Sequence, residues 1–161
     1  MTEQATAGRA GWLRHVTSIV GARQRADEIR RVLEAVRGGT PPADAWWRAA
    51  VLDGLLHGAR GHITTMKTVG ASRDALVALQ SDPNTEVRRA ALSLLAIAGR
   101  GDSEGWRRAL ERSLADARRP ALEAARRADA VTFVALDRPE RRVRWFQSLI
   151  APQEADRKSV V

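Results

Sequence analysis

Four prolines at nearly regular intervals constrain the fold of this chain more than any other feature. Successive members of the set are 41, 37 and 32 residues apart: Pro42, Pro83, Pro120 and Pro152. Each lies where a helix is expected to begin, and the first turn of a helix tolerates proline. Each is followed six residues later by a basic residue, and these are Arg48, Arg89, Arg126 and Lys158. A period of about 40 residues built from two helices predicts an α-solenoid, in which stacked helix pairs bury a continuous core.

Apolar side chains recur with helical spacing along the chain. The clearest stripe covers three turns without a break: Val87, Ala90, Ala91, Leu94, Leu95 and Ala98. Other stripes begin at Trp12, Ile29, Trp47, Trp106 and Val143, and Ser103 is a predicted N-cap before the stripe at Trp106. No segment alternates with a period of two, and residues 58–72 form either a long loop or a loop that hides a short helix. We therefore predict an all-α protein with about four helix pairs, the outer ones incomplete.

One stretch resembles the second-helix signature of HEAT repeats. It covers residues 82–92, Asp-Pro-Asn-Thr-Glu-Val-Arg-Arg-Ala-Ala-Leu, and looser copies cover residues 120–135 and 42–56. The resemblance implies that the proline turns the chain into the helix and that Val87 and the alanines pack inward. It also implies that Asp and Arg side chains bridge neighbouring repeats.

Several shorter stretches resemble the helical-repeat region of secreted dehydrogenase–cytochrome proteins of planctomycete-type bacteria. They are residues 20–23, 51–58 and 149–154. In that family the repeats lie between a propeller that resembles sugar dehydrogenases and a c-type haem domain. This chain has no Cys-x-x-Cys-His and no propeller strands, so the resemblance implies a connector without an active site. It implies an exported or periplasmic protein, and without it we expect a cytoplasmic one.

The last six residues, 156–161, match the translation of a common sequencing adapter in one reading frame. We therefore expect a non-native tail and a natural chain that continues beyond residue 155. The expected division is a disordered segment over 1–11, a HEAT-like domain over 12–155 and the tail over 156–161. We expect the apolar side of the helix over 143–150 to lack a partner.

Composition excludes several classes of protein. The chain has no cysteine, which excludes a disulfide scaffold, a thiolate metal site and a cysteine nucleophile. No apolar run approaches the roughly 20 residues that span a bilayer, so we expect no membrane insertion. The net charge is +8, but it is spread evenly: 11 basic and 7 acidic residues lie in 1–80, and 16 and 12 lie in 81–161. An even spread is typical of solvated helix faces rather than of a basic arm that binds nucleic acid.

No pattern in the sequence predicts catalysis or a bound cofactor. Two of the three histidines, His57 and His62, are five residues apart, which is poor geometry for a shared metal, and zinc needs three or four ligands. The chain lacks Gly-x-Ser-x-Gly, and residues 99–101, Gly-Arg-Gly, lack the Lys-Ser/Thr of a phosphate loop. We therefore expect no catalytic residue, no metal and no cofactor.

Four residues are candidates for a partner-binding surface: Trp46, Arg48, Arg89 and Arg126. Trp46 and Trp47 point about 100° apart on a helix, and the apolar stripe places Trp47 in the core. Trp46 either covers a neighbouring helix or lies in a binding surface, where tryptophan is a common hot spot. The arginines either bridge repeats together with interleaved acids or form a row that tracks a phosphate backbone.

These observations predict a non-catalytic scaffold or inter-domain connector. Its partner is another protein or the neighbouring domains of the same natural chain, which we expect to be a larger exported oxidoreductase. The alternative is a nucleic-acid-binding HEAT-like protein with rows of arginine on its concave face.

Overall fold

The computed structural model describes residues 3–39, 45–60 and 65–150. Every regular element within these ranges is a helix, so the predicted all-α class is confirmed. The helices are α1 Glu3–Arg23, α2 Ala26–Gly38, α3 Ala45–Ala59, α4 Thr65–Gly70, α5 Arg73–Leu79, α6 Thr85–Ala98, α7 Glu104–Ala117, α8 Ala124–Val134 and α9 Pro139–Ile150. Pro42, Pro152, Lys158 and the expected tail over 156–161 lie outside the described residues.

The N-terminal segment corrects one expectation. Residues 3–11 are helical and belong to α1, whereas we expected disorder over 1–11. The segment Glu-Gln-Ala-Thr-Ala-Gly-Arg-Ala is rich in good helix formers, and it continues directly into the apolar stripe that begins at Trp12. Within residues 58–72, which we predicted as a loop or a hidden short helix, the structure has the short helix α4.

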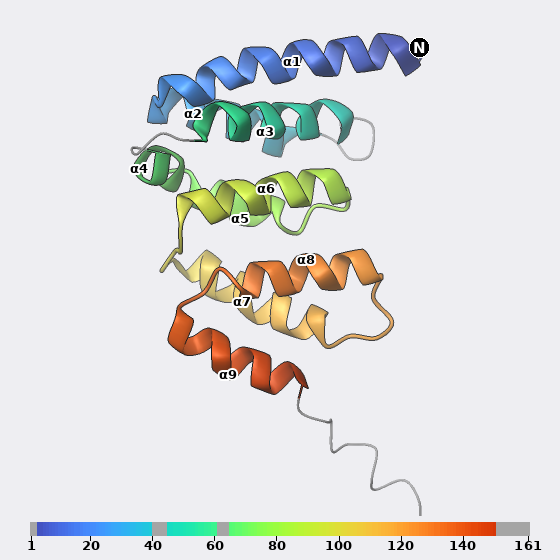
Figure 1. Cartoon of the computed structure of the whole chain (residues 1–161), viewed down its shortest axis with the longest axis vertical. Helices are drawn as coiled ribbons and strands as arrows, with labels where there is room; N and C mark the ends of the chain where they lie inside the picture. The colour runs from blue at the N-terminus through green and yellow to red at the C-terminus, as the bar shows by residue number, and fades with distance from the viewer. Residues whose placement is uncertain (1–2, 40–44, 61–64, 151–161) are drawn as a thin grey trace, which may run out of the picture.

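The helices lie in two rows (Figure 1). One row holds α1, α3, α6 and α8, and each of these helices contacts the next. The other row holds α2, α5, α7 and α9, also in contact with one another in that order, and α4 packs against α2 and α6. The helices of the first row all run from right to left in the view, whereas α7 and α9 run the opposite way. Helices far apart in sequence therefore lie side by side, and the buried apolar residues gather between the rows.

The predicted stripe of α6 packs into this core. Its members Val87, Ala91, Leu94, Leu95 and Ala98 are all buried, and Ala90 packs against the core from the edge.

Helices α6 and α7 each begin at a residue whose side chain caps the helix. The Asn84 side chain accepts hydrogen bonds from the backbone N–H groups of Glu86 and Val87, at 2.9 and 3.0 Å. The Ser103 hydroxyl accepts one from Trp106 N–H at 3.2 Å, so the predicted N-cap of α7 is confirmed.

Helices α1 and α3 approach each other unusually closely because α3 carries two glycines one turn apart. A methyl group at Gly58 would collide with the carbonyl oxygen of Ser18, and one at Gly54 would collide with the Thr17 hydroxyl. On the other helix, a methyl at Gly21 would lie 2.5 Å from the carbonyl oxygen of Leu55. The missing side chains therefore let the two backbones come into contact and fix α1 on α3.

Both ends of the stack expose apolar side chains. Helix α9 buries none of its residues, and Val143 and Ile150 are 60 % and 81 % exposed. Phe146 and Leu149 on the same side are half-buried, so among the described residues the expected apolar side is only partly uncovered. At the other end Trp12 is 65 % exposed on α1.

Candidate binding surfaces

Arg48, predicted as part of a partner-binding surface, lies in the core instead. It is the fourth residue of α3 and is 2 % exposed. Its Nη2 lies 2.5 Å from Asp82 Oδ2, and its Nε donates a hydrogen bond to the carbonyl oxygen of Val36 at 2.8 Å. A buried guanidinium needs such a carboxylate, because burial without one would cost several kcal/mol. The prediction that Arg48 contacts a partner is therefore wrong.

Arg88 has the same role one helix further along the first row. It is the fourth residue of α6, and its guanidinium lies 2.9 Å from the buried Asp129 of α8. Its Nη1 also donates to the carbonyl oxygens of Asp82 and Pro83, at 3.0 and 2.9 Å. The residues Arg48, Asp82, Arg88 and Asp129 form a continuous buried chain, which we call the Arg–Asp ladder. Its ion pairs join α3 to the turn before α6, and α6 to α8, and that such contacts bridge neighbouring repeats stays a prediction. Counting from the proline selected Arg89 rather than the buried Arg88.

Trp46 and Arg89 lie together in a groove that crosses α1, α3 and α6. The groove has a volume of about 600 Å³ and a floor of small residues that includes Ala49, Ala50 and Ala90. Trp46 is half-buried in it, whereas Trp47 packs against the core as predicted. We call this surface the α1–α3–α6 groove.

Charges of both signs line the α1–α3–α6 groove. Arg14 Nε lies 2.6 Å from Asp53 Oδ2, which joins α1 to α3 across it. Arg89 Nε lies 3.3 Å from Asp129 Oδ1. Arg60 and Glu86 also line the groove and are exposed, and neither has an ion pair with a described residue. The groove therefore combines an aromatic wall, a floor of small residues and open charges of each sign.

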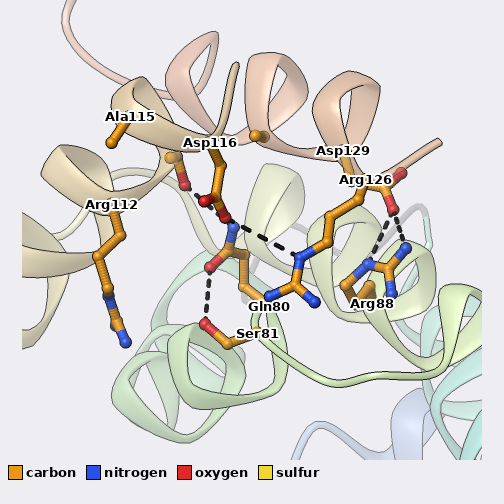
Figure 2. Close-up of a pocket in the computed structure, with 10 residues that line it drawn as sticks. Gln80, Ser81, Arg88, Arg112, Ala115, Asp116, Arg126 and Asp129 are labelled. Atoms are coloured by element: carbon orange, nitrogen blue, oxygen red, sulfur yellow. Dashed lines mark hydrogen bonds and ion pairs between the residues drawn. The ribbon is translucent and has the colours of Figure 1, made fainter. Parts of the chain in front are cut away.

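Arg126 lies in a separate pocket between the α5–α6 turn, α7 and α8 (Figure 2). This pocket, which we call the Arg112–Arg126 pocket, has a volume of about 260 Å³. Arg126 Nε faces Asp116 Oδ2 at 3.9 Å, and Gln80 Nε2 donates a hydrogen bond to Ser113 Oγ at 3.0 Å. Sequence reasoning did not select Arg112, Asp116 or Gln80. Arg112 and Asp116 lie one turn apart on α7, whereas Gln80 follows α5, so only the fold brings the three side chains to one pocket.

Among the described residues, no cluster of three or more His, Asp or Glu could hold a metal ion. His15 and His57 are exposed, and His62 lies outside the described residues. The Arg107 guanidinium, with a smaller contribution from Arg108, lowers the pKa of the Glu104 carboxyl below its usual value of 4.5. Glu104, Arg107 and Arg108 are exposed and form a charge cluster at the start of α7.

No protein-family model, no curated protein and no solved structure matches this chain. The resemblances to HEAT repeats and to dehydrogenase–cytochrome proteins therefore stay predictions. No helix in the described part of the chain is long and apolar enough to cross a membrane.

Proposed function

We propose that this chain is a non-catalytic scaffold or inter-domain connector built as an α-solenoid of HEAT type. Its α1–α3–α6 groove receives a segment of a protein, which is either a separate partner or a neighbouring domain of the same natural chain. The observation that carries the proposal is the half-buried Trp46 in a groove with a floor of small residues and open charges at Arg60 and Glu86. Tryptophan and arginine in a concave surface are common hot spots of protein interfaces.

Two features support the solenoid arrangement. The helices lie in two rows with the core between them. The Arg–Asp ladder also places an arginine at the same position, the fourth residue, of α3 and α6. Repetition of one contact along a row is what stacked repeats require, because each repeat is stabilised by its neighbours.

The ion pairs of the groove favour a protein partner over nucleic acid. Arg14 and Arg89 each have a carboxylate partner, Asp53 and Asp129 respectively. Binding of a phosphate backbone depends on arginines that neutralise phosphates, and single-strand binding adds stacking on several aromatic rings. Trp46 is the one aromatic residue that lines this groove among the described residues.

The proposal is tested with peptides selected from a displayed random library against the folded chain. Their affinities are measured by isothermal titration calorimetry for the wild type, Trp46→Ala and Trp12→Ala. Trp12 is an exposed tryptophan outside the groove and serves as the matched control. We expect Trp46→Ala to weaken binding by roughly tenfold or more, as at interface hot spots, and Trp12→Ala to leave it unchanged. Equal binding by Trp46→Ala and the wild type would overturn the proposal.

Nucleic acid is tested separately with a short DNA duplex in fluorescence anisotropy. We expect no binding at micromolar concentrations in physiological salt. Micromolar binding that weakens steeply as salt rises would instead favour the nucleic-acid alternative.

A further inference from the structure

The Arg112–Arg126 pocket has no part in the proposed scaffold function. It shares no lining residue with the α1–α3–α6 groove. Its walls come from the turn after α5, from α7 and from α8, with Arg88 of α6 at its inner side (Figure 2). Side chains from several separate elements thus line one polar cavity.

Two guanidinium groups in this pocket have N–H donors without an acceptor among the described residues. Arg112 is exposed, and its Nε donates to the carbonyl oxygen of Arg108 at 3.3 Å. It has no ion pair with a described residue, so its two Nη groups are open. Arg126 faces Asp116 at 3.9 Å, which is too far for a hydrogen bond. Each arginine therefore keeps its charge and most of its donors available.

The acceptors around the pocket are largely occupied. Asp129 accepts from both Arg88 and Arg89, at 2.9 and 3.3 Å. Ser113 Oγ accepts from the buried Gln80, whose own Oε1 accepts from the Ser81 hydroxyl at 3.3 Å. Asp116 is the one carboxylate of the lining that makes no hydrogen bond with a described residue. The lining thus has more donors than acceptors, and its three arginines exceed its two aspartates by one charge.

We propose that this pocket is an oxyanion site that binds a phosphate or carboxylate group between Arg112 and Arg126. Guanidinium groups present paired N–H donors that match the oxygens of both anions, and such charge-assisted hydrogen bonds are among the strongest in proteins. Asp116 is an internal competitor in this site, because it attracts Arg126 without bonding to it and repels an entering anion. Asp116 therefore weakens anion binding in the wild-type chain.

The first test is a titration of the full chain, labelled with ¹⁵N at arginine, with inorganic phosphate at constant ionic strength. We expect the Nε–H resonances of Arg112 and Arg126 to shift together along one saturable curve. Arg112→Ala and Arg126→Ala should each weaken the affinity by roughly tenfold or more. Arg141→Ala removes an exposed arginine outside this pocket and should leave the affinity unchanged. Shifts that are similar at all exposed arginines and do not saturate would overturn the proposal.

A variant that binds phosphate more tightly tests the site in a way that loss of folding could not imitate, because an unfolded variant would bind less. Asp116→Asn removes the competing carboxylate and should tighten phosphate binding by roughly threefold or more. Glu111→Gln makes the same change of net charge on the same helix, but Glu111 does not line this pocket. We expect Glu111→Gln to have a clearly smaller effect than Asp116→Asn. Equal effects would mean that net charge alone attracts the anion, and would contradict a site.

The source of the anion is distinguished by two further probes at the same ionic strength. Tighter binding of O-phosphoserine than of inorganic phosphate identifies a phosphorylated side chain, and equal binding identifies free phosphate. Tightest binding of acetate identifies an acidic side chain. Absence of saturable binding for all three probes would overturn the proposal. The variants of this site leave Trp46 untouched, so the result is independent of the peptide measurements.

Discussion

The buried pair of Arg48 and Asp82 is the most consequential contact at the scale of single residues. It joins α3 to the turn before α6, and both side chains are almost fully buried. Asp82 also accepts a hydrogen bond from Asn84 N–H at 3.0 Å, so one carboxylate serves both the ladder and the start of α6. The Asp82 carboxylate compensates the charge of the buried guanidinium, and removal of the partner leaves that charge without compensation.

We therefore expect Asp82→Ala to lower the free energy of unfolding by about 3–5 kcal/mol. Asp53→Ala breaks the exposed pair with Arg14 and should cost less than about 1 kcal/mol. Urea denaturation of both variants measures the difference. If Asp82→Ala costs no more than Asp53→Ala, the Arg–Asp ladder does not stabilise the stack.

The carboxyl of Glu104 gives a second prediction at this scale. Its Oε2 accepts from Arg107 Nε at 3.0 Å and its Oε1 accepts from Arg108 Nε at 3.0 Å, and these contacts lower its pKa. Because the pKa is lower in the folded state, the small stabilisation exists above the unfolded pKa and is lost as the pH falls through the folded pKa. We expect Arg107→Ala to raise the pKa of Glu104 towards 4.5, and by more than Arg108→Ala does. An NMR titration of the side-chain carboxyl checks the order, and a larger rise in Arg108→Ala would contradict it.

At the scale of helices, the contact between α1 and α3 depends on the absence of side chains. Gly58→Ala would place a methyl group against the Ser18 carbonyl, which is backbone and cannot rotate away. We expect α1 to shift and the free energy of unfolding to fall by about 1–3 kcal/mol. Gly8→Ala is the control on the same helix pair, because nothing lies near Gly8 and alanine favours helix. Chemical denaturation together with amide exchange of α1 measures both effects, and equal stability of the two variants would refute the close approach.

The helices could be predicted from the sequence, because their signals are local. The stripe over 87–98, the cap at Ser103 and the choice of Trp47 for the core all depend on neighbours within a turn or two. For the Arg–Asp ladder, the sequence predicts that Arg and Asp side chains pair, but not which arginine takes part. Arg88 and Arg89 are adjacent, and only the rotation of α6 against α8 decides which one is buried.

The two surfaces could not be predicted in full, because they combine distant parts of the chain. Trp46 and Arg89 share a groove although they lie on different helices, whereas Arg126 belongs to another pocket. Arg112 and Asp116 have no signal of their own in the sequence. Arg112 and Asp116 matter for the pocket because Arg88 and Arg89 already pair with Asp129, its other carboxylate.

At the scale of the whole molecule, both ends of the two rows expose apolar side chains. Terminal repeats normally carry a polar outer face, but Val143 and Ile150 are exposed on α9 and Trp12 on α1. Helix α9 also buries none of its residues, so few contacts oppose its local unfolding.

We therefore expect fraying of α9 or self-association that increases with protein concentration. Sedimentation velocity over a range of concentrations and amide exchange measure the two effects. Val143→Ser together with Ile150→Ser should reduce any association, because it removes exposed apolar surface. A monomer at high concentration with strong amide protection through Ile150 would contradict this prediction.

We propose the α1–α3–α6 groove as the surface that receives a protein segment. The most direct measurement is amide hydrogen exchange of the whole chain with and without a bound selected peptide. We expect added protection in α1, α3 and α6 around Trp46, and little change in α7 and α9. Protection confined to α7 and α9, with none around Trp46, would contradict it.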